Sequence, residues 1–417
     1  MNRIVLIGNG FDRAHNLNTS YEHFINWYWE QKAYLYLYYP YKINDILFTL
    51  QERSRRDASD LYNHFRSKNK ITIDEFKQYI LNNNSAYTAI FTEFFKHIIE
   101  GVETNGWVDI ENEYYQLLKY YSANRKDSEA HHLNEELKYL QDLLIEYLKK
   151  ISSKEPNIIK GIKDAIYEPI SQDDIAVEAK TKWEEWIAYW TYKEEIEWRR
   201  RAYDFGIEDN KASSYVYYAH DYKISPQNYN DIPTLFRLPE EIMLLSFNYT
   251  PTIKMYLQKD KQAFSINNIH GQLEQPESII FGHGDEMDEQ FKQIQNLNNQ
   301  EYLKNIKSIN YMKSDNYRKV LSFIESAPFQ IYIMGHSCGN SDRTLLNTLF
   351  EHDNCVSIKP FYYIKENGTD NYLELVQNIS RNFNSMKLMR DRVVNKEYCK
   401  PLDNEQQNNI DTSNQNS

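Results

Sequence analysis

IVLIGNGFD, residues 4–12, is the stretch that decides the fold of this chain. Its first four residues are apolar without polar alternation, which is typical of a strand buried on both faces of a parallel sheet. Gly8 and Gly10 permit unusual backbone angles and leave room for a close neighbour. Thr19 and Glu22 then have the spacing of a helix cap and its reciprocal partner. A strand, a glycine turn and a helix in this order begin a nucleotide-binding unit, in which backbone N–H groups can hold phosphate.

The glycine turn by itself does not identify a ligand. The usual dinucleotide fingerprint, G-x-G-x-x-G, needs a third glycine where this chain has Arg13. Gly8 and Gly10 are therefore equally consistent with ligand binding and with a plain tight turn.

Composition narrows the class of protein. At 417 residues the chain is long enough for two or three domain-sized units, and its formal net charge of −12 argues against a broad nucleic-acid-binding surface. Three cysteines without a C-x-x-C pair argue against a disulfide framework and a cysteine zinc site. No segment resembles a signal peptide or a membrane span. We therefore expect a cytoplasmic protein with no membrane partner and no metal.

Apolar patterning predicts an α/β fold, Rossmann-like, with a mostly parallel sheet and a large helical insertion. Strand-like runs place residues 1–19 and 236–398 in a nucleotide-binding core, whereas residues 20–235 form the helical insertion domain. The polar residues 399–417 are expected to be a disordered tail.

The helical insertion contains apolar stripes, acids and basic clusters. We interpret the stripes as core or helix–helix packing, with a dimer surface as the alternative; they are Leu133, Leu137, Leu140, Leu144 and Leu148, and Trp183, Trp186 and Trp190. In W-x-D-x-E, residues 107–111, Asp109 and Glu111 fit a helix entrance, and a substrate-facing role for Glu111 is the second interpretation. Basic clusters at 53–70 and 199–201 are interpreted as solvated helix faces rather than phosphate tracks.

Five predicted strands end in small or polar residues. Those at 4–7, 242–247, before 270, 279–281 and 331–334 run into GNGFD, SFNYT, IHG, FGHGD and GHSCGNSD, and a further strand is predicted near 356–364. Since the carboxyl ends of parallel strands share one edge, where open α/β sheets bind ligands, we predict a single cleft. Its residues would be Gly8, Asn9, Gly10, Asp12, Asn248, His270, His283, Gly335, His336, Ser337 and Asp342.

These residue types suit a nucleotide that carries ribose. Glycine turns admit phosphate, Ser337 or Asp342 could bind ribose hydroxyls, and His270 could act as a general base near neutral pH. Asn248 could orient a water molecule or an amide, since it offers both a donor and an acceptor. The structural alternatives are a helix cap for Asn248, a turn for His270 and a helix N-terminal carboxylate for Asp342. Three widely separated histidines indicate a metal site only weakly.

The opening MNRIVLIGNGFDRAHNLNTSYEHF resembles that of the bacterial abortive-infection AbiH family, which begins with a strand, GNGFD, a small polar loop and an S-Y-x-x-F helix. SFNYT, IHG, GHG and GHSCGNSD are similar to the remaining motifs of the family and follow in the same order. The helical middle contributes mainly W-x-D-x-E. The resemblance implies a role in stopping the growth of phage-infected cells, with an unknown phage-derived trigger.

The same motif order is distantly similar to the sirtuin-like NAD-binding fold. This similarity implies that Gly8 and Gly10 lie at the phosphates, that Asn248 assists on the nicotinamide side, and that His270 is the base. It also implies a ribose-facing loop made of Gly335, His336, Ser337 and Asp342. Gly282-His283-Gly284 has no secure counterpart in that fold.

Departures from the sirtuin-like pattern favour NAD cleavage over protein deacylation. The chain has no four-cysteine zinc module, and a long helical block stands where the small domain would be. The resemblance therefore implies that NAD is the substrate and that its N-glycosidic bond is hydrolysed with release of nicotinamide. The alternatives are a nucleotide-binding sensor without catalysis and, with less support, an RNA- or DNA-targeting effector. The sequence leaves a homo-oligomer open.

Overall fold

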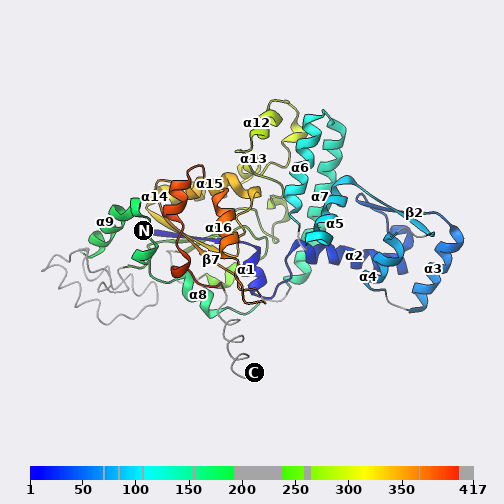
Figure 1. The fold of residues 1–417 in the computed structure, drawn as a ribbon, viewed down its shortest axis with the longest axis horizontal. Helices are drawn as coiled ribbons and strands as arrows, with labels where there is room; N and C mark the ends of the chain where they lie inside the picture. Colours follow the sequence, from blue (N-terminus) through cyan, green and yellow to red (C-terminus); the bar gives the residue numbers. More distant parts are fainter. Residues whose placement is uncertain are drawn as a thin grey trace, which may run out of the picture. The chain divides into compact units, whose positions relative to one another are not determined.

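The computed structural model describes residues 1–68, 71–82, 85–105, 108–153, 156–191, 237–257, 264–365 and 367–402. As far as it is described, the chain forms two compact units (Figure 1). Unit 1 consists of residues 1–17, 154–280 and 308–417, and unit 2 consists of residues 18–153 and 281–307. The chain therefore enters and leaves unit 2 twice.

Unit 1 is built on a five-stranded parallel sheet. Its strands are β1 (Asn2–Ile7), β4 (Ile242–Ser246), β5 (Phe264–Asn268), β6 (Phe329–Met334) and β7 (Cys355–Phe361), in the order β5-β4-β1-β6-β7. Every neighbouring pair is parallel; Ile4 of β1, for example, lies beside Met243 of β4 and Ile331 of β6. The order runs from β1 outward to β4 and β5 on one side and to β6 and β7 on the other. The predicted mixed α/β class with a mostly parallel sheet is confirmed.

Both faces of this sheet are covered, which explains why its central strands are apolar without alternation. On one face Val5 and Met334 pack with helices α8 (Lys160–Ile166) and α9 (Lys180–Thr191). On the other face Ile4 and Ile333 pack with α14 (Asn316–Ser326), α15 (Arg343–Phe350), α16 (Tyr372–Ser380) and α17 (Met386–Arg392) (Figure 1). Two apolar cores, one on each side of the sheet, therefore hold unit 1 together.

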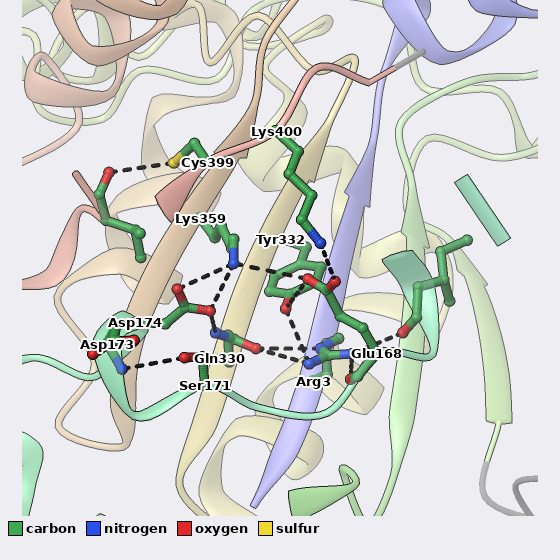
Figure 2. A network of polar contacts seen from close by, with 12 residues as sticks. Arg3, Glu168, Ser171, Asp173, Asp174, Gln330, Tyr332, Lys359, Cys399 and Lys400 are labelled. Carbon is green, nitrogen blue, oxygen red and sulfur yellow. Dashed lines mark hydrogen bonds and ion pairs between the residues drawn. The ribbon is translucent and has the colours of Figure 1, made fainter. Parts of the chain in front are cut away.

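A layer of buried charges lies on the α8 face of the sheet (Figure 2). The Arg3 guanidinium of β1 donates to the backbone oxygen of Glu168 at 2.6 Å, and the Lys359 ammonium of β7 pairs with Asp174 at 3.0 Å. The Gln330 amide of β6 joins the two groups, since it accepts from Arg3 at 3.0 Å and donates to Asp174 at 3.1 Å. Burial raises the pKa of Asp174, and Lys359 opposes that rise. The network ties the loop before α9 to three neighbouring strands.

Unit 2 is mainly helical. Its helices are α2 (Tyr21–Tyr38), α3 (Arg55–Lys68), α4 (Ile73–Phe76), α5 (Glu93–Asn105), α6 (Ile110–Ala123), α7 (Asp127–Ile151) and α12 (Glu289–Gln295). It also contains an antiparallel pair, β2 (Phe48–Glu52) with β3 (Tyr87–Phe91), which the helical prediction for this block missed. The two strands pack on an aromatic core, where the Trp29 ring contacts those of Phe48 and Phe91. The predicted leucine stripe is buried along α7, as expected for core packing.

The unit boundaries differ from those expected. Residues 156–191 were assigned to the helical insertion but belong to unit 1, because Ile162 of α8 and Trp183 of α9 pack into the core on the sheet. Residues 281–307 were assigned to the nucleotide-binding core but belong to unit 2. The Trp190 side chain and the basic residues 199–201 lie outside the described residues.

Two predictions near the chain's strands need correction. Residues 279–281 form no strand, because the sheet ends at β5 and the chain passes here from unit 1 into unit 2. The helix that follows the glycine turn is α1 (Asn9–Ala14), which begins directly after Gly8. The capped helix that the sequence predicted after the glycine turn is the next one, α2. Its N-cap is Ser20 rather than Thr19, because the Ser20 hydroxyl accepts a hydrogen bond from the His23 N–H at 3.3 Å.

The tail was predicted to be disordered from residue 399, but residues 399–402 belong to the packed structure of unit 1. Cys399 and Leu402 are buried, and Leu402 belongs to the core on the α8 face. Backbone hydrogen bonds tie this segment to the end of β7, since Tyr362 N–H donates to Lys400 O at 3.3 Å and Leu402 N–H donates to Tyr362 O at 2.8 Å. Residues 403–417 lie outside the described residues.

Candidate functional site

The glycine turn after β1 is packed directly against the loop after β6. Gly10 N–H donates to Gly335 O at 2.8 Å. Gly335 has a φ of +75°, and a Cβ built on it would lie 2.0 Å from Phe11 N; one built on Gly8 would lie 2.4 Å from His336 Cα. The close neighbour that these glycines admit is therefore the chain itself. The N–H groups of Gly8 and Gly10, which the sequence assigned to phosphate, are engaged with backbone carbonyls.

Polar residues follow the ends of four neighbouring strands of unit 1. Ser246 of β4 is paired with Ile7 of β1 and with Asn268 of β5, and Ile7 is also paired with Met334 of β6. Two residues later in the sequence come His270, Asn248, Asn9 and His336, which we call the polar row; Asn9 is already the first residue of α1. The Asn248 side-chain N–H donates to Gly8 O at 2.9 Å, so Asn248 joins two strand ends and is not a helix cap.

Asp342 lies between two histidines of this row. Its Oδ1 is 3.2 Å from His270 Nε2, and its Oδ2 is 3.5 Å from His336 Nε2. Asp342 occupies the N-cap position of α15, but its side chain makes no cap hydrogen bond there. All three side chains are buried, with His270 only 3 % exposed. A carboxylate that bridges two imidazoles therefore stands at the carboxyl edge of the sheet.

Hydrogen bonds distinguish the two imidazoles. Cys338 N–H donates to His336 Nδ1 at 3.0 Å, so this nitrogen is an acceptor and the ring proton is on Nε2, facing Asp342. His270 also turns Nε2 to Asp342, and the Tyr311 hydroxyl lies 3.3 Å from the same nitrogen; where Nε2 donates to the carboxylate, Nδ1 is the basic nitrogen of the ring. The arrangement therefore favours His270 as a general base and His336 as a residue that orients Asp342.

Two aromatic side chains fix the histidines, and sequence reasoning missed both. The Phe247 ring lies 4.1 Å from the His336 ring and 5.2 Å, edge-on, from the His270 ring. The Tyr311 ring is parallel to that of His270, and its hydroxyl lies 3.3 Å from His270 Nε2. Phe247 was readable as the last residue of the predicted strand at 242–247, whereas no motif pointed to Tyr311.

Asp12 forms a second buried acidic position beside SFNYT. It is 1 % exposed, and its Oδ2 accepts a hydrogen bond from Thr250 Oγ1 at 2.5 Å. Within the described part of the chain its Oδ1 has no hydrogen-bond partner. Burial raises the pKa of Asp12 to about 6, although hydrogen bonds from Thr250, Thr252 and Asn248 lower it. A carboxyl group with this pKa exchanges its proton near neutral pH.

Two predicted site residues stand outside this cluster. Ser337 is exposed, and the hydrogen bond that fixes it is made by its backbone oxygen, which accepts from Asn378 Nδ2 at 2.9 Å. His283 belongs to unit 2, where its ring is stacked on that of Tyr115. Unit 1 therefore gathers the other predicted strand ends, and His283 is part of a different local structure.

A cavity of about 240 Å³ lies elsewhere in unit 1, at the ends of β6 and β7. Met334, Phe361 and Leu402 supply apolar walls, and Glu168 and Lys400 supply charges. These two charges pair with each other at 2.9 Å (Figure 2). None of the predicted site residues lines this cavity. Met334, which does, directly precedes the site residue Gly335.

The described residues hold neither a clustered metal site nor a membrane-spanning helix. No group of three or more His, Cys, Asp or Glu side chains in them is arranged to hold a metal ion. No helix in the described ranges has the length and apolar character needed to cross a lipid bilayer.

Comparison with known proteins places the chain in a family. The family model described as "Bacteriophage abortive infection AbiH" matches residues 4–363. This match begins in β1 and covers the strand ends that form the polar row, the loop with Asp342 and all of unit 2. No curated protein and no solved structure matches the chain. From the family match alone, the chain belongs to the AbiH family, whose description connects it with the abortive infection of bacteriophage.

Proposed function

We propose that this protein is an abortive-infection effector that hydrolyses NAD, or a closely related nucleotide, after infection has activated it. The observation that carries the proposal is the carboxylate of Asp342 shared by His270 and His336 at the carboxyl edge of a parallel sheet. Histidine paired with a carboxylate is a common general base for activating water near neutral pH.

The position of this group supports a nucleotide as the substrate. Open α/β sheets bind ligands outside the carboxyl ends of their strands, where the strand order reverses. In the order β5-β4-β1-β6-β7 the reversal lies between β1 and β6, as in Rossmann-like sheets. Asn9 and His336 follow the two strands that flank that point, and Asn248 follows β4 on the other side of β1. Because Gly8 and Gly10 are packed on the β6 loop, the proposal gives them a packing role and assigns recognition to the polar row.

The proposed reaction uses one water molecule. The Nδ1 of His270 takes a proton from the water as its oxygen bonds to C1′ of the ribose. The bond from C1′ to the pyridinium nitrogen breaks, its electron pair leaves with the ring, and the products are neutral nicotinamide and ADP-ribose. Asp342 stabilises the imidazolium formed on His270, and Asn248 positions the water or the departing ring.

Burial of the His270 side chain supports a silent resting state. An effector that destroyed NAD in uninfected cells would stop their growth, so the proposed activity must begin only on infection. In this proposal the trigger gives the substrate access to His270.

The test combines purified protein with infected cells. Full-length protein recovered from phage-infected cells is incubated with NAD, and cellular NAD is followed during the same infection. Wild type is expected to release nicotinamide, and His270→Ala and Asp342→Asn to abolish the release while remaining folded. His352→Ala is the matched control, since His352 is a unit 1 histidine that pairs with Glu325 at 3.3 Å, outside the row. NAD that stays constant in infected wild-type cells would exclude this function.

A nucleotide sensor without catalysis is the second candidate. Two observations favour it. The Gly8 and Gly10 N–H groups are hydrogen-bonded to backbone carbonyls, and His270 is buried, so the structure is closed at this edge of the sheet. A rise in melting temperature with NAD or ADP-ribose, with the ligand recovered intact, would select this function.

A further inference from the structure

The cavity of unit 1 has the size and the apolar walls of a site for a small ligand. Its volume is about 240 Å³, and it is lined by the last residues of β6 and β7 and by α8. Its walls are formed by the buried side chains of Ile162, Ala165, Met334, Phe361 and Leu402. A cavity of about 150 Å³ holds benzene, so the larger volume here has room for one six-membered ring with a substituent of a few atoms. We call it the α8 cavity.

The mouth of the α8 cavity is charged. Lys400 and Glu168 both line it, and the Lys400 ammonium is 2.9 Å from Glu168 Oε2 (Figure 2). The Lys400 side chain is 55 % exposed, so the cavity reaches the surface at this residue. Asp164, which also lines the cavity, is paired with Lys160 at 3.4 Å, and this pair adds no net charge. Because an exposed ion pair contributes little to stability, Lys400 can turn to another partner at low cost.

Glu168 has other partners besides Lys400. Its Oε1 accepts from the Tyr332 hydroxyl at 2.9 Å and lies 3.8 Å from the Lys359 ammonium (Figure 2). Burial works against the charged form of Glu168, but Lys359, Lys400 and Arg3 outweigh it and hold the pKa of this carboxyl below its usual value. Because two of these cations and the Tyr332 hydroxyl remain in place, Glu168 stays a charged and hydrogen-bonded carboxylate when Lys400 leaves it.

The charges beside the α8 cavity do not balance. The buried layer and its neighbour at the mouth contain three cations and two carboxylates, which are Arg3, Lys359 and Lys400, and Glu168 and Asp174. With all five ionised, three positive and two negative charges leave a net charge of +1. Arg3 is fully buried, and its guanidinium donates to the backbone oxygens of Ile166 at 2.9 Å and Glu168 at 2.6 Å, which are neutral acceptors. Since charges interact more strongly where water is excluded, a net positive cluster beside a cavity favours an anion in it.

We propose that the α8 cavity is a binding site for a small organic anion, a carboxylate carried on a single ring. The ring lies against the apolar walls, and the carboxylate meets the Lys400 ammonium, which turns from Glu168 to the ligand. A cationic ligand would instead displace Lys400 from Glu168 and raise the net charge of the cluster, whereas a monoanion neutralises it. None of the residues that line the cavity belongs to the polar row, so this site does not depend on the proposed function.

Three probes of nearly the same shape test the charge of the ligand. Benzoate, benzamide and benzamidine share the ring and the size of the substituent, but at neutral pH they are an anion, a neutral molecule and a cation. Each is titrated into full-length protein and followed by saturation-transfer NMR, which suits the dissociation constants of about 1 mM that so few contacts provide. Benzoate is expected to bind about tenfold more tightly than benzamidine, with benzamide between them. Equal or tighter binding of benzamidine would overturn the choice of an anion, and the absence of saturable benzoate binding would overturn the site.

Two lysine variants locate the carboxylate. Lys400→Met keeps an apolar stem and removes the ammonium, so it is expected to weaken benzoate binding about tenfold, as for the loss of one hydrogen bond to a charged group, and to leave benzamide binding unchanged. Lys396→Met is the matched control, because the Lys396 side chain is exposed to a similar extent and pairs with Asp370 at 2.6 Å, outside the cavity. Equal weakening in both variants would refute the role of Lys400.

A third variant fills the cavity. Ala165 lies on α8 and lines the apolar wall, so Ala165→Leu should abolish the binding of all three probes in protein that circular dichroism shows to be folded. Benzoate binding that persists at full strength in folded Ala165→Leu would show that the probe binds elsewhere and would refute the inference. If Ala165→Leu does not fold, the two lysine variants decide the question, since both lysine side chains are largely exposed.

Discussion

Asp12 makes the stability of unit 1 dependent on pH in a predictable direction. Burial raises its pKa from 3.8 to about 6. Because the folded-state pKa lies above the unfolded one, the native state keeps a proton that the unfolded state has lost between about pH 4 and pH 6. The free energy of unfolding contributed by Asp12 therefore falls as the pH rises through that interval and is constant above it. The rise in pKa corresponds to about 3 kcal/mol, at 1.36 kcal/mol for each tenfold change in proton affinity.

Asp12→Asn isolates this contribution. The amide keeps an oxygen that can accept from Thr250 and has no charge to bury. We expect wild type to lose about 3 kcal/mol relative to the variant between pH 4 and pH 7, measured by urea unfolding at closely spaced pH values. Taking the difference in unfolding free energy between the two proteins removes the contributions of the other titrating groups, which are common to both. Asp60→Asn, at an exposed aspartate of α3, controls for the loss of one negative charge.

The refuting result is a flat difference. If the unfolding free energies of wild type and Asp12→Asn stay parallel from pH 4 to pH 7, then the Asp12 carboxyl has an ordinary pKa, and its burial is compensated by contacts other than the Thr250 hydrogen bond. A difference that grows in the opposite direction would mean that the folded state favours the charged carboxylate.

Three further substitutions test the packing. Gly335→Ala should destabilise by at least about 3 kcal/mol in urea unfolding, because its φ of +75° and a Cβ 2.0 Å from Phe11 N both require backbone movement; a cost below about 1 kcal/mol would contradict the close packing. Lys359→Met should cost about 3–5 kcal/mol at pH 7 by leaving Asp174 buried without its cation, and adding Asp174→Asn should restore part of that stability; no recovery in the double variant would argue against the pairing. Ser20→Ala should lower stability by about 1 kcal/mol through loss of the α2 cap, whereas Thr19→Ala should not; equal effects would contradict the cap assignment.

The sheet could be predicted because the apolar composition of its strands indicates that they are buried. Residues 4–7, 242–247 and 331–334 are apolar runs of strand length, and a strand that is buried on both faces needs no other signal. The same rule failed at 279–281. A short apolar run also occurs in a buried segment that forms no strand, and periodicity cannot separate the two cases.

The unit boundaries were harder to read, because helices give the same pattern wherever they pack. The tryptophans of α9 form a stripe that fits an insertion as well as a sheet cover, and only tertiary contacts show that Trp183 packs on the sheet. The antiparallel pair of β2 and β3 was missed for a related reason: its strands are short and only partly buried, so alternation is weak.

At the candidate site, sequence reasoning gave the strand ends but not the partners. His270, His336 and Asp342 were placed in one cleft from topology alone, whereas their pairing depends on rotamers that no spacing encodes. The glycines were read as a ligand cradle because glycine signals a close approach without saying what approaches. Here the neighbour is Gly335.

The order in which this chain is synthesised has a consequence for its production. β1 is made first, yet Arg3 lies beside Gln330, 327 residues later, and beside Ile242. At about 5–20 residues per second, a ribosome needs about 15–65 s to supply Gln330. Until then at least one edge of this apolar strand is open, which is the condition that favours aggregation. Expression at high yield should therefore require chaperones that shelter the N-terminus, and chains released before β6 has been translated should be insoluble.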